Sequence, residues 1–458
     1  MLYRCRLSGF ANVINLPLVR AYPDNSIFAY RAGRPVGVDR FLHDVTQLAQ
    51  SLPARRYIFN LCNDRYHFVV GFFAALLQRQ INLLPPNQTP DLIGQLKHRY
   101  ADVYCLTDGA SAYHALETVF YPAPADARPA VRSTPLVPAG QIAAIVFTSG
   151  STGQPVPTEK TWGSLVRGAA AELDRLGIRA CPGMAILGTV PPQHMYGLES
   201  SVLMVMQGGL ALHAGRPFYP ADVLAELAAL PRPRCLVTTP IHLRALLSET
   251  GSLPPLDLML CATAPLSPQS AAAAERRFAA PLYEIYGCTE AGQVATRRTT
   301  ASAEWHALPG VRLRQDRHGT WVDGGHVETA VMLQDIIELR GEARFLLHGR
   351  TADLVNIAGK RTSLASLNYH LNSISGVRDG VFVVPGDGDG AANRLAAFVV
   401  APGLTPEMIM HALRQRIDSA FLPRPLRLVD ALPRNATGKL PREALRTLAT
   451  GRSTGTGR

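Results

Sequence analysis

The stretch Thr148-Ser149-Gly150-Ser151-Thr152-Gly153 decides the fold class, because it directly follows the apolar run 142–147. The run predicts a buried strand. Glycines and hydroxyl-bearing residues leave backbone N–H groups and hydroxyls open to phosphate oxygens. The GxxxxGK[ST] pattern of a Walker A loop is absent. We therefore expect a phosphate-binding loop of another type, with a polar turn between strand and helix as the alternative.

Downstream of this loop, short apolar runs alternate with amphipathic stretches. The alternation predicts an α/β fold with a largely parallel sheet covered by helices. The expected strands are 142–147, 184–190, 234–238, 256–260 and 282–286, and the expected helices are 162–176, 198–206, 241–248 and 268–278.

After about Thr299 the pattern changes to short antiparallel strands with glycine-rich turns, and then to a smaller α+β unit. The strands are expected at 311–314, 321–322, 327–333, 336–339 and 344–347. The small unit is expected to hold helices 363–373, 406–420 and 442–448 and strands 380–384 and 395–400. We predict a large N-terminal domain with mainly parallel sheets and a small β-subdomain (1–352), a small mobile C-terminal domain (353–450) and a disordered tail (451–458).

Composition narrows the partners. The net charge of +11 suits acidic partners such as nucleotides, coenzyme A, carrier proteins or nucleic acid, although simple solubility explains it equally well. Part of the excess is local, since residues 411–458 hold ten Lys or Arg against three Asp or Glu. Only four basic residues are lysines, Lys97, Lys160, Lys360 and Lys439, which suggests that lysine is kept where a compact ammonium group is needed.

The sequence argues against a membrane span and a disulfide framework. The longest apolar segment, 68–77, is too short to cross a bilayer and is expected to be a buried helix. The seven cysteines are scattered without a CxxC pair, so we expect free, mostly buried thiols and no structural zinc site. No signal region is evident at the N-terminus, and a cytoplasmic protein is expected.

Two further motifs have the residue types of a nucleotide site. Tyr286-Gly287-Cys288-Thr289-Glu290 follows an expected strand. In it, tyrosine can stack on a base, threonine can donate to phosphate, and Glu290 can hold Mg²⁺. Near the C-terminus, Lys439 stands on a glycine-containing loop between two prolines. Taken singly, the first could be a strand-end turn and the second a solvated lysine.

Together the three motifs resemble the acyl-adenylate-forming superfamily, which includes acyl- and aryl-CoA synthetases, peptide-synthetase adenylation domains and luciferases. The family pattern TSG[ST]TGxP is met at 148–155, YGxTE at 286–290 and PxxxxGK at 433–439. The resemblance covers most of the chain from about Gln141 to Leu448. It implies ATP and Mg²⁺ as cofactors and a carboxylic acid as substrate.

The resemblance also implies roles for single residues. Lys439, Glu290 and Lys160 would be catalytic, with Glu290 on Mg²⁺ and Lys160 on pyrophosphate in place of the family's loop lysine, where Val156 stands. Asp335 would hold the ribose hydroxyls, and Asp353 would be the hinge of the small domain. The ATP/AMP-binding set would be Thr148, Ser149, Gly150, Ser151, Thr152, Gly153, Ala262, Thr263, Ala264, Tyr286, Gly287, Cys288, Thr289, Asp335 and Arg350; the acyl pocket would hold His194, Tyr196, Gly197 and Thr239.

The mix of polar and aromatic pocket residues suits a small aromatic acid better than a fatty acid. The chain looks similar to stand-alone ligases of aryl-polyene and xanthomonadin-type pigment pathways, which load 3- or 4-hydroxybenzoate-like acids onto an acyl carrier protein. The basic C-terminal lobe would fit an acidic carrier protein, and equally the 3′-phosphate of coenzyme A. Either acceptor presents a phosphopantetheine thiol.

Two other classes of protein are left open by the sequence. A catalytically degenerate nucleotide-binding homologue is supported by the missing loop lysine alone. A nucleic-acid binder would explain the charge, but no recognised nucleic-acid-binding motif accompanies it, so none is expected as a partner. The oligomeric state is left open.

Overall fold

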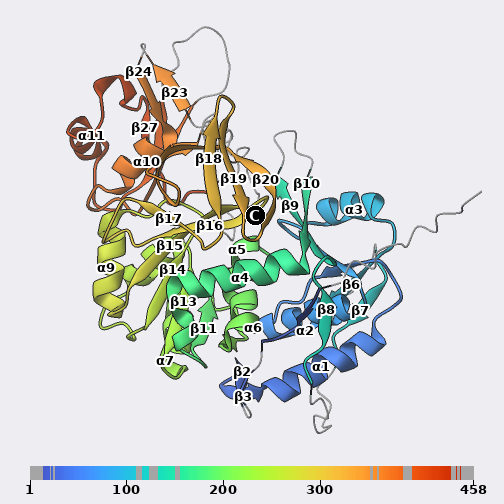
Figure 1. Cartoon of the computed structure of the whole chain (residues 1–458). Helices are drawn as coiled ribbons and strands as arrows, with labels where there is room; N and C mark the ends of the chain where they lie inside the picture. The colour runs from blue at the N-terminus through green and yellow to red at the C-terminus, as the bar shows by residue number, and fades with distance from the viewer. Residues whose placement is uncertain are drawn as a thin grey trace, which may run out of the picture.

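The computed structural model describes residues 14–20, 22–23, 26–109, 116–122, 133–149, 155–350, 354–357, 360–384, 395–434, 440 and 444 (Figure 1). Several expectations lie outside this part of the chain: loop residues Gly150 to Gly153, the hinge Asp353, Lys439, nearly all of the helix 442–448 and the tail. The side chains of Thr148, Ser149, Arg350 and Asn356 are also outside it.

The first of two large sheets is formed mainly by the N-terminal third of the chain. Its strand order is β10-β9-β5-β4-β6-β7, with all pairs parallel except β9 and β10. The strands are β4 (Tyr57–Asn60), β5 (Ile81–Leu84), β6 (Val103–Thr107), β7 (Thr118–Phe120), β9 (Ile142–Ser149) and β10 (Pro155–Thr161). Helices α1 (Val38–Ser51) and α2 (Arg65–Leu77) pack against each other, and α3 (Pro90–Arg99) joins β5 to β6.

The apolar segment 68–77 lies within α2, as expected for a buried helix. Nearly every residue of α2 is buried. Within the described residues, no helix combines the length and apolar character that crossing a membrane requires.

The second sheet has eleven strands and a parallel centre. The centre runs β15 (Leu282–Cys288), β14 (Leu258–Cys261), β13 (Arg234–Thr238), β11 (Ala185–Gly188), β12 (Ala211–His213) and β2 (Ile27–Arg31), with β3 (Arg34–Gly37) at the edge. Along β11, Ala185 and Leu187 face one hydrophobic cluster and Ile186 faces another, which is the two-residue alternation of a sheet buried on both faces.

The second sheet separates these two hydrophobic clusters, and helices cover each of its faces. The first contains residues of α4 (Trp162–Leu176) and α2 and lies between the two large sheets; the second contains residues of α7 (Pro220–Ala229), α8 (Pro240–Ser248) and α9 (Pro268–Phe278). The predicted α/β architecture is therefore confirmed.

The predicted change to antiparallel strands after Thr299 is also confirmed. The second sheet continues through β16 (Gly292–Arg297), β17 (Trp305–Ala307), β22 (Arg344–Arg350) and β21 (Asp335–Leu339), and β18 (Arg312–Asp316), β19 (Gly319–Gly324) and β20 (Val327–Leu333) form a separate three-stranded sheet. A two-stranded ribbon pairs β1 (Asn15–Pro17) with β8 (Leu136–Pro138).

The C-terminal unit has its own hydrophobic clusters, made of residues from 355 onward, and lies above β14–β17 in Figure 1. It contains β23 (Leu354–Ile357), β24 (Lys360–Ser363), α10 (Leu364–Asn372), β25 (Asp379–Val383), β26 (Ala396–Val400), α11 (Pro406–Arg414) and β27 (Leu426–Leu428). An ion pair at 3.3 Å between Arg244 of α8 and Asp379 ties it to the rest of the chain. These separate clusters support the predicted boundary at 352/353, which stays a prediction.

Two expected elements differ from the structure, and one strand near the site was not expected. The helix predicted at 198–206 is α5 (Met195–Leu198), a π-helical turn (Glu199–Leu203) and α6 (Met204–Gly208). The helix predicted at 406–420 ends at Arg414, and Asp418 then caps a short 3₁₀ turn. Strand β10 was not predicted, and it places two strands, not one, before α4.

Candidate active site

Four neighbouring parallel strands end at one edge of the second sheet. The register pairs Gly188 with Val237, Thr238 with Cys261 and Cys261 with Glu284, so β11, β13 and β14 finish side by side, and β15 runs on beyond them to Cys288. The segments that follow β11, β13 and β14 hold the predicted residues His194, Tyr196 and Gly197, then Thr239, then Ala262 to Ala264. Tyr286 to Glu290 lie at the end of β15 and in the turn after it. Ligands of open α/β sheets bind at the carboxyl ends of the strands. The structure thus brings four predicted segments to one edge.

The phosphate-loop motif lies between two antiparallel strands. β9 leads into it and β10 returns from it, pairing Val156 with Thr148 and Lys160 with Ala144. Lys160 is therefore on a strand, ten residues beyond Gly150, and is only 6% exposed. Its predicted contact with pyrophosphate stays a prediction.

The motif Tyr286 to Glu290 forms the end of β15 and the turn into β16. Thr289, Glu290 and Ala291 make that turn, and Glu290 is exposed. The Nζ of Lys160 donates to the backbone carbonyl of Glu290 at 2.8 Å. Lys160 therefore joins β10, the strand after the phosphate-loop motif, to a turn 130 residues further along the sequence.

Tyr286 and Asp335, both predicted to contact the nucleotide, lie against each other. The Tyr286 hydroxyl donates to Asp335 Oδ2 at 2.8 Å. The Tyr286 ring packs beside Trp305 and Phe345, with centroids 5.7 and 5.6 Å away. The pair fixes the first residue of β21 at the end of β15.

The segment that starts at Ala262 has an uncommon backbone. Thr263 has φ +84°, a left-handed conformation that a β-branched residue rarely adopts. Such strain persists only where the surroundings hold it, and it gathers at functional sites. Part of that support is Glu284, whose Oε1 accepts the Leu266 N–H at 3.2 Å while Arg297 Nε donates to Oε2 at 3.0 Å. Glu284 belongs to none of the sequence motifs and was not predicted.

The predicted acyl-pocket residues are held by strand ends. The Tyr196 hydroxyl donates to the Thr238 carbonyl at 3.2 Å, and burial raises the pKa of Tyr196 well above its usual range. Thr239 is fully buried and caps α8, accepting from the His242 N–H. His194 occupies the N-cap position of α5.

His242 is a second residue at this edge that the sequence did not reveal. Its Nδ1 lies 2.9 Å from the Thr189 hydroxyl, which is 3.0 Å from the Thr238 hydroxyl. Phe218 packs edge-on against the His242 ring, and burial lowers the pKa of His242. His242 lies in the first turn of α8 and belongs to no sequence motif, so the sequence did not point to it.

Residues around the start of α2 hold the segment 188–197, which contains most of the predicted acyl-pocket residues and is called the acyl-pocket segment below. We call these holding contacts the clamp. Arg65, the first residue of α2, is fully buried and donates to the carbonyls of Gly188 and Val190 at 2.7 and 2.8 Å. Gln193 Nε2 donates to the Cys62 carbonyl at 3.1 Å. The segment before Tyr196 is thus tied to the start of α2 at both ends.

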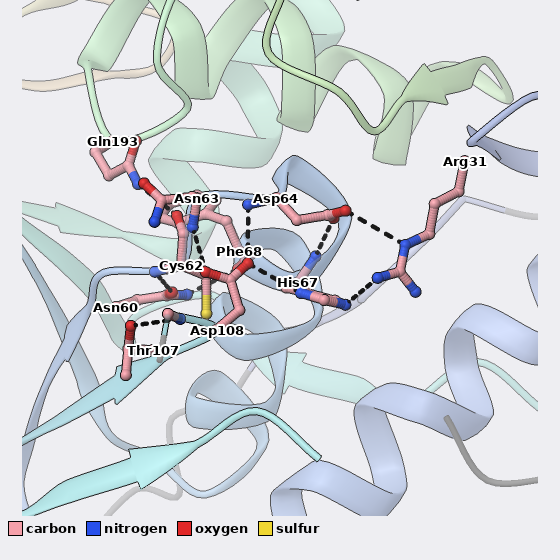
Figure 2. Close-up of polar contacts among 11 residues, drawn as sticks. Arg31, Asn60, Cys62, Asn63, Asp64, His67, Phe68, Thr107, Asp108 and Gln193 are labelled. Carbon is pink, nitrogen blue, oxygen red and sulfur yellow. Dashed lines mark hydrogen bonds and ion pairs between the residues drawn. The ribbon is translucent and has the colours of Figure 1, made fainter. Parts of the chain in front are cut away.

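Figure 2 shows how the clamp is supported. Asp108, just beyond β6, accepts the N–H groups of Asn63 and Asp64 at 2.8 and 2.9 Å and lies 3.0 Å from His67 Nδ1. Arg31 approaches from the far side and donates to Asp64 at 3.3 Å. The network fixes the turn between β4 and α2, from which Arg65 reaches the second sheet.

The π-helical turn directs two polar side chains inward. Ser200 Oγ donates to Glu172 Oε1 at 2.7 Å and accepts from Gln293 Nε2 at 2.8 Å. Glu199 Oε1 accepts the Gln293 N–H at 3.3 Å. Burial raises the pKa of Glu172 to about 7 and that of Glu199 to about 8. π-Turns often mark functional sites, and this one lies directly after the acyl-pocket segment.

Glu172 predicts a pH-dependent stability. Its folded pKa of about 7 exceeds its ordinary 4.5, so the folded state binds the proton more tightly than the unfolded chain. The stabilisation is present below pH 4.5 and is lost as pH rises through 7, a change on the order of 3 kcal/mol. We expect Glu172→Gln to flatten the fall in the free energy of unfolding between pH 5 and 8, measured by urea denaturation. Exposed Glu342→Gln is the control; a slope unchanged by Glu172→Gln would contradict the assignment.

The residues present fit Mg²⁺ bound together with a nucleotide. Magnesium is usually held by one or two carboxylates plus substrate phosphates, not by an all-protein cage. Glu290 supplies one exposed carboxylate at the strand edge, and among the described residues no group of three or more His, Cys, Asp or Glu could hold a metal alone.

Other predicted residues are placed less fully. Arg350 ends β22, where its backbone pairs with Asp335. Lys360 is exposed, and its Nζ contacts Asp418 Oδ2 at 2.6 Å. Of the described cysteines, Cys62, Cys105, Cys235 and Cys261 are buried, as expected, and Cys181 and Cys288 are partly exposed.

Comparison with known proteins agrees with this geometry. The model of the AMP-binding enzyme family matches residues 45–317. A 4-coumarate–CoA ligase from Rhodobacter capsulatus is 29% identical over 301 residues, covering 65% of this chain and 74% of that protein. A 2-succinylbenzoate–CoA ligase from Bacillus cereus is 26% identical over 345 residues, covering 66% and 69%.

Solved structures share the fold. The anthranilate CoA ligase AuaEII in complex with anthranoyl-AMP aligns with a TM-score of 0.79 at 15% identity, covering 93% of this chain and 94% of that one. The o-succinylbenzoate coenzyme A synthetase of Bacillus subtilis in complex with AMP aligns with a TM-score of 0.78 at 19% identity, covering 94% and 98%. At these identities the likeness concerns the fold alone.

Proposed function

Because the chain belongs to the AMP-binding enzyme family, we propose that it adenylates a small aromatic carboxylic acid and transfers the acyl group to the phosphopantetheine thiol of an acyl carrier protein. The reaction class follows from the family and its relatives: the chain is an acyl-adenylate-forming ligase. The observation that carries the proposal is the meeting of four predicted segments at the carboxyl ends of β11, β13, β14 and β15.

The proposed chemistry has two steps. A carboxylate oxygen attacks the α-phosphorus of ATP, and the bond to pyrophosphate breaks. The thiol sulfur then attacks the acyl carbon, and AMP leaves. The protein must align two anions and offset the charge that develops, which makes positioning and electrostatics the main contributions.

The chain's residues divide that work. Loop residues 148–153 would donate to the β- and γ-phosphates, and Lys439 would lie between carboxylate and α-phosphate. Asp335, held by Tyr286, would accept from the ribose hydroxyls. Mg²⁺ bound at Glu290 would neutralise phosphate charge.

Support for an aromatic acid comes from the residues around the predicted acyl pocket. Tyr196 is buried beside β13, and Phe218 and His242 stack edge-on next to Thr189. This lining offers aromatic faces and a few hydroxyls and suits a flat ring with a polar substituent. The names of the relatives, which include 4-coumarate and 2-succinylbenzoate ligases, favour the same class. A hydroxybenzoate of the pigment-pathway type is the proposed substrate.

Two molecules are candidates for the acceptor of the acyl group. The relatives are coenzyme A ligases, which makes coenzyme A the second candidate. The carrier protein is favoured by a groove between α11 and residues 423–426, where Arg414 and Arg424 flank Met410 and Leu426. Glu407 also lines this groove, which remains net basic because of its two arginines. Apolar contacts inside such a rim suit an acidic helical partner. A cytoplasmic location stays a prediction.

Acid-dependent ATP–pyrophosphate exchange tests the adenylation step. We expect exchange with hydroxybenzoates or cinnamates and little with fatty acids. Exchange with no acid in the panel would favour a degenerate homologue.

Adding holo carrier protein or coenzyme A then tests the acceptor. Charge reversal by Arg414→Glu with Arg424→Glu should lower kcat/KM for the carrier protein but leave coenzyme A unaffected, and exposed Arg317→Glu is the control. Transfer to coenzyme A alone would overturn the carrier assignment.

A further inference from the structure

Lys160 is a buried lysine on the edge strand β10. Its residue is 6% exposed, whereas Lys97 and Lys360 are exposed. It faces inward from β10 at the position that pairs with Ala144 of β9. A buried ammonium group is costly unless hydrogen bonds and opposite charge compensate it, so its partners indicate what it does.

The direct partner is a backbone atom of the adjacent turn. Lys160 Nζ donates to the Glu290 carbonyl at 2.8 Å, while Glu290 itself is exposed. The buried Lys160 therefore holds the backbone of the turn between β15 and β16 at Glu290, whose side chain is exposed. Lysine suits this task because its flexible stem places three donors on a compact head.

The π-helical turn supplies the acidic group that faces the Lys160 ammonium group. Lys160 and Glu199 line the same small cavity, together with Met195, Gly292 and His326. Its volume of about 10 Å³ is roughly that of one water molecule. Glu199 also accepts the Gln293 N–H, so one carboxylate contacts β16 and faces Lys160.

The backbone of the turn is shaped around this pair. Gly292 has φ +77°, and a Cβ there would lie 2.6 Å from Glu199 Oε1. Only glycine allows both the left-handed backbone and the close approach of the carboxylate. The π-helical turn that follows the acyl-pocket segment and the Glu290 turn are thereby joined through Glu199, Gly292 and Lys160.

We propose that Lys160 is a positioning residue that fixes the Thr289–Glu290–Ala291 turn from within and so orients Glu290 for Mg²⁺ and ATP. Glu199 keeps the Lys160 ammonium group in place and links the turn to the acyl pocket. This inference rests on the proposed role of Glu290. In this proposal Lys160 does not contact pyrophosphate directly, as the resemblance implied, but acts by holding the Glu290 backbone.

The test separates positioning from mere charge balance. Lys160→Met is compared with Lys160→Arg, with the double variant Lys160→Met/Glu199→Gln and with the exposed control Lys97→Met. The double variant replaces both members of the pair with uncharged side chains, so Glu199 no longer faces a lost partner, and the thermal stability lost in Lys160→Met should be recovered. If Lys160 positions the turn, the double variant should still bind Mg·ATP about 10–100-fold more weakly than wild type, as is typical when support of a metal ligand is lost.

Two readouts do not depend on turnover. Calorimetric titration of ATP with and without Mg²⁺ should show the loss only with Mg²⁺, and the amides of residues 290–292 should exchange hydrogen faster in the double variant. Glu290→Gln should show the same Mg²⁺-specific loss. Wild-type affinity and exchange in the double variant would overturn the inference.

Failure of the proposed function looks different. If wild type binds Mg·ATP but shows no acid-dependent pyrophosphate exchange, the proposed reaction fails while the Lys160 comparison still stands. If Glu290→Gln keeps its Mg²⁺ dependence but the double variant loses amide protection, Lys160 positions a turn that does not serve Mg²⁺, and the inference is wrong.

Discussion

Lys439→Ala is expected to lower acid-dependent ATP–pyrophosphate exchange by about 10²–10³-fold, equivalent to roughly 3–4 kcal/mol, the loss typical of removing one preorganised charge from a transition state. The ammonium group would offset charge on the carboxylate and the α-phosphate as their bond forms. Transfer of the acyl group from a preformed adenylate to the thiol does not need this charge and should be largely retained.

The two half-reactions are measured separately, by pyrophosphate exchange and by thioester formation from synthetic acyl-adenylate. Exposed Lys97→Ala should leave both unchanged. An unimpaired exchange rate in Lys439→Ala would remove the role assigned to Lys439, and an equal loss in both half-reactions would indicate a damaged C-terminal unit.

The parallel centre of the second sheet was accessible from the sequence because each strand is buried on both faces. Such strands are continuous apolar runs, and the helices between them carry one apolar stripe. The predicted strands at 234–238 and 282–286 therefore correspond closely to β13 and β15. The predicted pocket residues came from the family resemblance, and the structure places their segments after strand ends.

Strand β10 was hidden by its composition. Pro155 and Pro157 argue against a central strand, but β10 is at the edge of its sheet, where proline is tolerated. Its far end holds Lys160, which the sequence presents as a polar residue in a polar stretch. Only the returning hairpin turns Lys160 inward toward Glu290.

Long-range clamps were also beyond the sequence. Arg65 stands at the start of an apolar helix, where an arginine usually marks a solvated end, yet it is fully buried against Gly188 and Val190. The π-turn at Glu199 likewise leaves no local signature, because it is stabilised by Glu172 and Gln293 from distant elements. Motif reasoning found the residues expected to contact ligands and missed those that hold them.

Gly197→Ala is expected to lower the free energy of unfolding by about 1–3 kcal/mol or more, because the added methyl has no space. A Cβ at Gly197 would lie 2.1 Å from the Pro191 carbonyl oxygen and 2.9 Å from its carbon. Backbone atoms cannot rotate away as a side chain can, so residues 191–196 must shift. That segment includes His194 and Tyr196, and KM for the acid should therefore rise as stability falls.

The matched control is Gly94→Ala in α3, where a Cβ meets no atom within 4 Å. Alanine favours the helix there by roughly 0.5–1 kcal/mol, so this variant should be slightly more stable and fully active. Urea denaturation and acid-dependent pyrophosphate exchange measure both variants. A Gly197→Ala protein with wild-type stability but a raised KM would mean that the 191–197 segment yields without cost, and that Arg65 and Gln193 do not hold it rigidly. If stability falls while KM stays constant, Tyr196 does not line the acid pocket.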